Sequence, residues 1–274
     1  MNTQSKDYLR DETVQPAKTR AEPENSQAYY ERGVIYAAQG RPEDAVQEFE
    51  SAVRIEHDFT KAHHNLGSIY FEQGRLDEAI GAYEAALRIQ PNLAETRHGL
   101  GLVFGKKGFV DKAISEFQAA LNIEPDYAEA HYNLGVMYIA KRRMDKAIGE
   151  FKDALRVKPD YIDAHINLGA VHSAQGRPDE AVREYQAALE IKPDCAEAHY
   201  NLGVNYGARG WHDNALSEFQ AAIRIKPDYV AAQENLAVAY WQRGRRKEAI
   251  DQWRIAAKLG SVQARNYLDQ LGIE

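Results

Sequence analysis

A glycine that returns every 34 residues is the feature that most restricts how this chain can fold. Six glycines keep this interval and an alanine takes the next place: Gly33, Gly67, Gly101, Gly135, Gly169, Gly203 and Ala237. A fixed period of this length indicates stacked copies of one small unit. With the glycine as position 8 of each unit, the sequence predicts seven units, at 26–59, 60–93, 94–127, 128–161, 162–195, 196–229 and 230–263.

Each unit has the pattern of two helices. In the first, a leucine precedes the glycine and an aromatic residue follows it by three places, as in Leu134, Gly135 and Tyr138, so that one face is apolar. A second glycine ends this helix in six units, where a left-handed residue costs least. Arg142 takes that place in the fourth unit, and we expect a slightly strained turn there.

The second helix carries alanine, an aromatic residue and alanine at spacings of four and three, as in Ala181, Tyr185 and Ala188. A proline then ends most units. After it comes an Asp or Asn with a carboxylate three residues later, which predicts capping boxes at Asn92/Glu95, Asp126/Glu129, Asp160/Asp163 and Asp194/Glu197.

The combined pattern N-L-G-x-x-Y, G, A-x-x-x-F-x-x-A, P resembles the tetratricopeptide repeat over most of the chain. The resemblance implies an all-α fold, a right-handed α-solenoid of seven tandem helix-turn-helix repeats whose first helices line a concave groove. We expect residues 1–25 to be a disordered polar tail and residues 264–274 to form a short C-terminal cap over the last repeat.

Position 6 of the first helix carries a recurring asparagine, at Asn65, Asn133, Asn167, Asn201 and Asn235. The asparagine side chain offers the donors and acceptor that complement a peptide unit. Helices pack about 10 Å apart, close to three residues of extended chain. The series therefore predicts a ladder that holds an extended segment by its backbone. It resembles the asparagine ladder of O-linked N-acetylglucosamine transferases; the alternative is that each asparagine bonds to the neighbouring repeat.

Other positions on the same side predict side-chain pockets beside the ladder, formed by Tyr132, Tyr200, Val136, Val204 and Ile166. The alternative for the aromatic residues is packing between repeats. The carboxylate clamp that binds chaperone C-termini is disfavoured, because position 5 is never lysine and position 9 is never asparagine.

Composition excludes several function classes. The net charge of −7 argues against a basic surface stripe of the kind that binds the phosphate backbone, so a nucleic-acid-binding function is not expected. No apolar run is long enough to span a membrane, and the start of the chain lacks a secretory signal. The single cysteine, Cys195, excludes an internal disulfide and fits a cytoplasmic location.

Histidine recurs at position 4, at His63, His131, His165 and His199. Because these copies lie one repeat apart, the four cannot share one ion, and we expect packing rather than a metal site. No cofactor is expected.

The sequence thus predicts a non-catalytic scaffold that binds an extended or helical peptide segment of a protein partner in the groove. We expect a monomer with at most weak self-association. Nothing outside the repeats is long enough for a catalytic domain. Two alternatives remain: a targeting or regulatory subunit of a separate enzyme, such as a glycosyltransferase acting in trans, and a module that stacks end to end.

Overall fold

The computed structural model describes residues 25–273, which form fifteen α-helices and, within that range, no strand. The predicted tail at 1–25 lies outside the described residues except for Asn25. None of the helices in the described part is both long enough and apolar enough to cross a membrane. The described chain falls into two compact units, divided between Lys141 and Arg142.

Unit 1 contains the first seven helices: α1 Ser26–Ala38, α2 Pro42–Ile55, α3 Thr60–Glu72, α4 Leu76–Ile89, α5 Ala94–Lys106, α6 Val110–Ile123 and α7 Ala128–Ala140. Unit 2 contains the other eight: α8 Met144–Val157, α9 Ile162–Ala174, α10 Pro178–Ile191, α11 Ala196–Ala208, α12 His212–Ile225, α13 Val230–Gln242, α14 Arg246–Lys258 and α15 Val262–Gln270.

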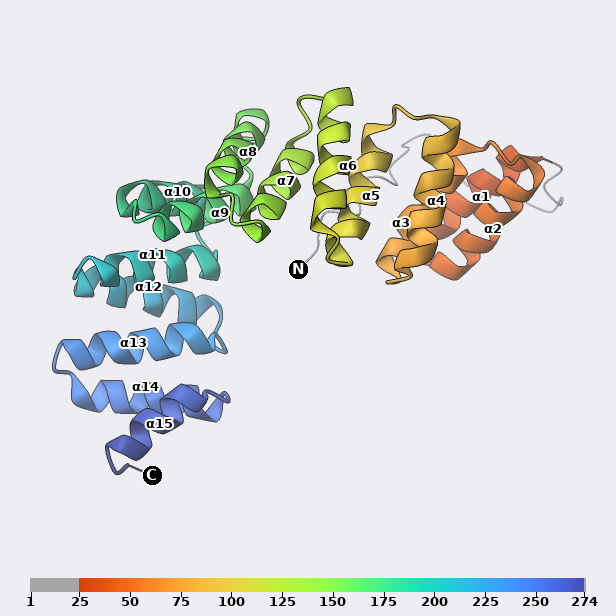
Figure 1. Ribbon diagram of the computed structural model, residues 1–274. Coiled ribbons are helices and arrows are strands. Elements are labelled where there is room, and N and C mark those ends of the chain that lie inside the picture. Colours follow the sequence, from red (N-terminus) through yellow and green to blue (C-terminus); the bar gives the residue numbers. More distant parts are fainter. Residues whose placement is uncertain (1–24, 274) are drawn as a thin grey trace. The chain divides into compact units, whose positions relative to one another are not determined.

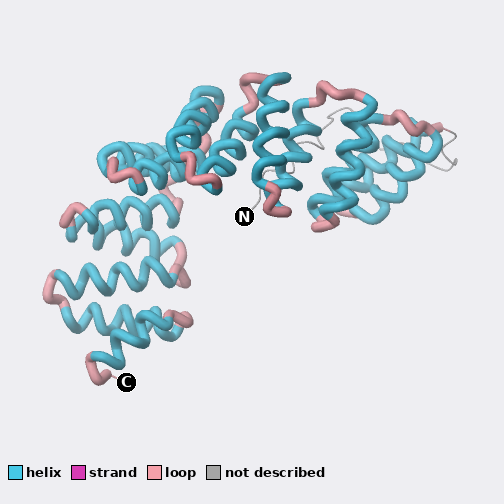
Figure 2. The backbone as a smooth tube through the Cα atoms, viewed as in Figure 1, coloured by secondary structure: helices cyan, strands magenta, loops and turns pink. Residues whose placement is uncertain are grey.

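Within each unit, every helix packs against the helix before it and the helix after it (Figure 1). The first helices of successive repeats also contact one another, α3 with α5 and α5 with α7 in unit 1, and α9 with α11 and α11 with α13 in unit 2. Short loops join the helices (Figure 2). The predicted all-α solenoid of paired helices is confirmed.

The periodic glycine is explained by an aromatic ring. A Cβ built on Gly169 would lie 2.7 Å from a ring carbon of Tyr185, and one on Gly203 would lie 2.7 Å from Phe219. Tyr185 is 2% exposed, so its ring has no space to retreat. The glycine therefore lets the aromatic residue of the second helix lie directly on the backbone of the first, and each repeat is closed by this contact.

Replacing this glycine is expected to destabilise the protein. Gly169→Ala should lower the free energy of unfolding by about 1–3 kcal/mol, because the added methyl group overpacks against Tyr185. Gly149, in α8, is the matched control, since a Cβ there meets nothing within 4 Å. Gly149→Ala should stabilise by up to about 1 kcal/mol through helix propensity. Urea denaturation measures both, and a neutral Gly169→Ala would contradict this account of the repeat.

The left-handed residue predicted after the first helix is present in the described repeats. Positive φ angles occur at Gly40, Gly74, Gly108, Gly176, Gly210 and Gly244. Arg142 has a φ of 55° and is the only residue other than glycine with a positive φ between residues 25 and 273. The expected strained turn at Arg142 is confirmed.

Arg142→Gly should therefore stabilise the protein, by about 0.5–1 kcal/mol, because relief of the left-handed strain exceeds the added entropy of the unfolded chain. The reciprocal change Gly176→Arg should destabilise by about 1–2 kcal/mol. Thermal and urea unfolding of the two variants test the pair, and a loss of stability in Arg142→Gly would be the contrary result.

The predicted capping boxes are wrong. The N-cap residues of α5, α7, α9 and α11 are Leu93, Tyr127, Tyr161 and Cys195, and none makes a side-chain capping bond. Each helix begins one residue later than a box requires. The Asp or Asn that was expected to be the N-cap lies one residue before it. The acidic residue three places later is therefore the second residue of the helix rather than the third. These carboxylates are thus not used in capping boxes.

Candidate functional site

The first helices of unit 2 present one uncovered side, which we call the open face of unit 2. It consists of positions 2, 6, 9 and 13 of three helices: Asp163, Asn167, Ala170 and Ala174 on α9; Glu197, Asn201, Val204 and Ala208 on α11; Ala231, Asn235, Val238 and Gln242 on α13. Spacings of four, three and four keep each set on one side of its helix. None of these residues is buried, and Val204 is 38% exposed.

Most asparagines of the predicted ladder join neighbouring repeats. The amide nitrogen of Asn235 donates to the hydroxyl of Tyr200 at 3.2 Å and to the carbonyl of Ala231 at 2.9 Å. In unit 1, the Asn65 amide donates to the hydroxyl of Tyr30 at 3.4 Å. The acceptor side chain is always residue 5 of the preceding repeat. In Asn235 both amide hydrogens are used, which leaves only the side-chain oxygen free for a ligand.

The same junction in unit 1 uses histidine. The amide of Asn133 donates to Nε2 of His98 at 2.9 Å and to the carbonyl of Glu129 at 2.8 Å. Because Nε2 accepts, Nδ1 carries the proton and donates to the hydroxyl of Tyr127 at 3.2 Å. Burial lowers the pKa of His98 to about 4, so the ring is neutral at pH 7. His98 is therefore part of the repeat junction.

Asn201 is different. Residue 5 of the preceding repeat is Ile166, which has no acceptor, and the side chain of Asn201 makes no hydrogen bond to any residue in the described range. Its backbone carbonyl accepts from the Asn205 amide at 3.0 Å. Asn201 thus carries a complete, unused amide at the middle helix of the open face.

The residues that were predicted to form pockets beside the ladder differ in how far they are exposed. Ile166 is 5% exposed and belongs to the hydrophobic core, so it does not line the open face. Tyr200 packs its ring 4.9 Å from that of Tyr229, and burial raises the pKa of its hydroxyl. Val204 is exposed on α11. In α7 of unit 1, Tyr132, Val136 and Asn133 are each half-buried.

The ladder is interrupted at Gly99 for a steric reason. A Cβ on Gly99 would lie 2.7 Å from Cζ of Tyr83, whose ring also lies against Gly67. The hydroxyl of Tyr83 contacts the hydroxyl of Ser68 at 3.1 Å. No side chain fits at position 6 of this repeat while the tyrosine keeps its place.

The position-4 histidines are hydrogen-bond bridges. Nε2 of His165 donates to the carbonyl of Pro159 at 3.1 Å, and Nδ1 lies 2.7 Å from the carboxylate of Glu184. His199 repeats the arrangement with Pro193 and Glu218. Burial opposes charge on His165, but the bonds to Glu184 and Pro159 prevail and raise its pKa above the ordinary value. These histidines tie the turn to the second helix, a role that the packing interpretation missed.

The His165 bridge predicts a pH-dependent contribution to stability. Folding raises the pKa of His165, so the protonated ring stabilises the folded state. This stabilisation is complete below the unfolded pKa of about 6.5 and is lost as the pH rises through the folded pKa. His165→Gln keeps a donor for Pro159, as Gln233 does for Pro227 at 3.1 Å. Urea denaturation should show the variant less stable than wild type by about 1 kcal/mol at pH 5.5 and by less at pH 8. Equal differences at both pH values would refute the bridge.

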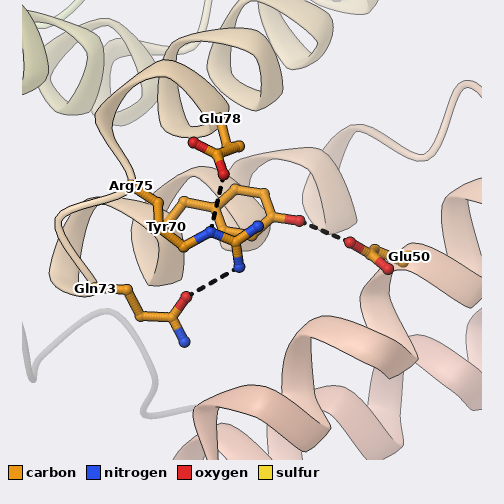
Figure 3. Close-up of polar contacts among 5 residues, drawn as sticks. All are labelled: Glu50, Tyr70, Gln73, Arg75 and Glu78. Atoms are coloured by element: carbon orange, nitrogen blue, oxygen red, sulfur yellow. Dashed lines mark hydrogen bonds and ion pairs between the residues drawn. The ribbon is translucent and has the colours of Figure 1, made fainter.

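A second repeated arrangement, an arginine stacked on a tyrosine, was not predicted from the sequence. The guanidinium of Arg75 lies 4.2 Å from the ring centre of Tyr70, and its Nε donates to Glu78 at 3.0 Å (Figure 3). The hydroxyl of Tyr70 donates to Glu50 of the preceding repeat at 2.8 Å. Burial and this hydrogen bond raise the pKa of Tyr70 to about 12. The signal was present, since arginine occupies this place in five repeats: Arg41, Arg75, Arg143, Arg177 and Arg245.

Ion pairs also join successive repeats at the turns. Lys107 pairs with Asp77, and Lys141 pairs with Asp111 at 2.8 Å in unit 1. In unit 2, Arg209 pairs with Asp179 at 2.6 Å, and Arg243 with Asp213 at 2.8 Å. The aspartates are well exposed, so each pair adds little stability by itself.

The family models confirm what the fold indicates. One described as tetratricopeptide repeat matches residues 17–59, 166–230 and 205–264, and a second of the same description matches 126–194. A third, described as TPR repeat, matches 67–108 and 106–142. The chain belongs to the tetratricopeptide repeat family. No match is found among curated proteins.

Solved structures of similar fold include MamA, which is 29% identical over 59% of this chain and 95% of its own, with a TM-score of 0.56. YrrB is 23% identical over 70% of this chain and 100% of its own, with a TM-score of 0.59. A tetratricopeptide repeat protein from Parabacteroides merdae is 18% identical over 89% of this chain and 97% of its own, with a TM-score of 0.66.

Proposed function

We propose that this chain is a non-catalytic interaction scaffold, in which residues 26–263 form seven repeats and the open face of unit 2 binds an extended segment of a partner protein. The observation that carries the proposal is the unused amide of Asn201 beside the exposed side chain of Val204. An amide that both donates and accepts can hold a peptide unit, and an adjacent aliphatic surface takes an apolar side chain.

The surroundings of Asn201 suit a main chain. The side-chain oxygen of Asn235 remains as an acceptor, one repeat away. Small residues at Ala170, Ala174 and Ala208 leave room for a backbone to approach the helices. The solved structure of YrrB, which shares the fold, is described as that of a TPR protein with an unusual peptide-binding site.

The two asparagines give a matched test. Asn201→Ala should weaken peptide binding about three- to tenfold, because a hydrogen bond contributes about 0.5–1.5 kcal/mol, and should leave stability within about 0.5 kcal/mol. Asn235→Ala should lower the free energy of unfolding by about 1 kcal/mol, because it breaks the junction with Tyr200.

The probe is a set of peptides selected from a random phage-displayed library on the full chain, with affinities measured by fluorescence anisotropy and stability by urea denaturation. Val204→Asp should also abolish binding, and Arg183→Ala, exposed on α10 in the other layer, should not change it. If peptides bind equally well to Asn201→Ala and Val204→Asp, the proposed face is wrong.

The alternative of a targeting subunit for a glycosyltransferase acting in trans rests on the resemblance of the asparagine ladder. A ladder that binds a ligand needs asparagine side chains whose amides make no bond within the protein. The amides of Asn65, Asn133 and Asn235 instead donate to the preceding repeat. We therefore favour the scaffold. Co-purification of this chain with glycosyltransferase activity, lost in Asn201→Ala, would reverse the preference.

A further inference from the structure

Asn205 on α11 is a buried polar residue at a place that the other repeats fill with an apolar side chain. It stands at position 10 of its repeat, and only 4% of it is exposed. The other residues at position 10 are apolar: Ile35, Ile69, Val103, Met137, Val171 and Ala239. An asparagine in such a place costs stability unless its polar atoms are bonded, so its partners matter.

The amide of Asn205 is only partly used. Its nitrogen donates to the backbone carbonyl of Asn201 at 3.0 Å, which leaves one amide hydrogen and the side-chain oxygen. Neither has a partner among the described residues, and the oxygen is accessible to solvent. Nδ1 of His172 and Oε1 of Gln233 also lack a partner, but these two atoms are sealed from solvent. Asn205 differs from them because its unbonded oxygen is open to a ligand.

A serine of the neighbouring first helix faces Asn205. Ser173 stands at position 12 of the fifth repeat, on α9, and α9 contacts α11 (Figure 1). In unit 1 the matching places are held by Gly105 and Met137, and a Cβ built on Gly105 would lie 3.6 Å from Sδ of Met137. Position 12 of one repeat thus meets position 10 of the next, which puts Ser173 against Asn205.

Both of these places are polar only where the fifth repeat meets the sixth. Position 12 is otherwise small or largely hydrophobic: Ala37, Phe71, Gly105, Ile139, Gly207 and Trp241. The hydroxyl of Ser173 makes no hydrogen bond with any residue of 25–273. Asn201, with its unused amide, precedes Asn205 by four residues, about one helical turn or 5.4 Å along α11. We call Ser173, Asn201 and Asn205 the polar junction.

We infer that the polar junction binds a side-chain carboxamide, of glutamine or asparagine, on the segment that the open face of unit 2 holds. This inference rests on the proposed function and names the side chain that the site selects. The oxygen of Asn205 accepts one hydrogen bond and its second amide hydrogen donates another. A primary carboxamide offers the matching donor and acceptor, and the hydroxyl of Ser173 either donates to it or accepts from it.

The three side chains of the polar junction are neutral, which limits what they bind. A charged side chain would exchange its hydration for neutral partners in a buried place, and this exchange costs free energy. An aliphatic side chain would cover the oxygen of Asn205 and leave it unbonded. A carboxamide satisfies the oxygen and the amide hydrogen together. It enters from the side of α11 that carries Asn201, where the main chain of the bound segment lies.

The test is a double-mutant cycle on the full chain, with the peptides selected from the random phage-displayed library. These peptides should share a glutamine or asparagine at one place. Its exchange for leucine in a rhodamine-labelled peptide should weaken binding to the wild type about tenfold, because two hydrogen bonds are lost. In Asn205→Leu, which keeps the branched shape and removes the polar atoms, the same exchange should cost less than about twofold. Fluorescence anisotropy measures the four affinities.

Two other variants complete the design. Asn214→Leu, exposed on α12 in the other layer, is the matched control and should keep the effect at about tenfold. Ser173→Ala should reduce the effect by about threefold, and it serves as the test if Asn205→Leu does not fold. Circular dichroism verifies folding. The inference is overturned if the selected peptides contain no excess of carboxamides, or if the exchange costs as much in Asn205→Leu and Ser173→Ala as in the wild type.

The same peptides separate this inference from the proposed function. If they lose affinity in Asn201→Ala and Val204→Asp but show no preference for a carboxamide, the inference fails and the scaffold stands. If they are insensitive to all changes on α11, the proposed face itself fails, and the inference fails with it. Peptides that contain a carboxamide and lose affinity in Asn201→Ala and Asn205→Leu support both.

Discussion

The contact of one aromatic ring with a glycine backbone is the constraint on which the other features depend. In unit 1, the ring of Tyr83 lies against Gly67 of its own repeat and against Gly99 of the next. The same ring therefore sets the spacing within a repeat and between repeats. The missing asparagine at Gly99 is a consequence of this packing.

Once the rings fix that spacing, most recurring polar residues are used to join repeats. Asn65, Asn133 and Asn235 donate to the preceding repeat, and Tyr70 donates to Glu50 in the same direction. Gln220 donates to the hydroxyl of Tyr240 at 2.7 Å in unit 2. An asparagine of the series that makes no such bond is therefore informative, and on unit 2 Asn201 stands out for this reason.

Much of the fold follows from local pattern. The glycine and aromatic spacing located the helix pairs, and the absence of glycine at Arg142 located the strained turn. The repeat starts were located correctly, but the N-cap was placed one residue too early, because the Asp–x–x–Glu spacing forms a capping box only if the Asp is the N-cap residue. The helix instead begins after Tyr127 or Tyr161.

The candidate site was less predictable, because the state of each asparagine depends on a residue 35 places earlier. Asn235 and Asn201 have the same local sequence pattern, yet the first meets Tyr200 and the second follows Ile166. Treating the asparagines as one ladder could not separate them. The bridging role of His165 was also missed, although Glu184 recurs as Glu218 at the matching place of the next repeat.

The dependence of Asn201 on Ile166 has a consequence for how such a chain changes over evolution. The availability of an amide belongs to the junction of two repeats, so the order of the repeats carries information that no single repeat contains. A copy of the fifth repeat inserted before the seventh would place an isoleucine ahead of Asn235 and remove its side-chain acceptor. Duplication and shuffling of whole repeats can therefore create or abolish binding positions without a single point mutation.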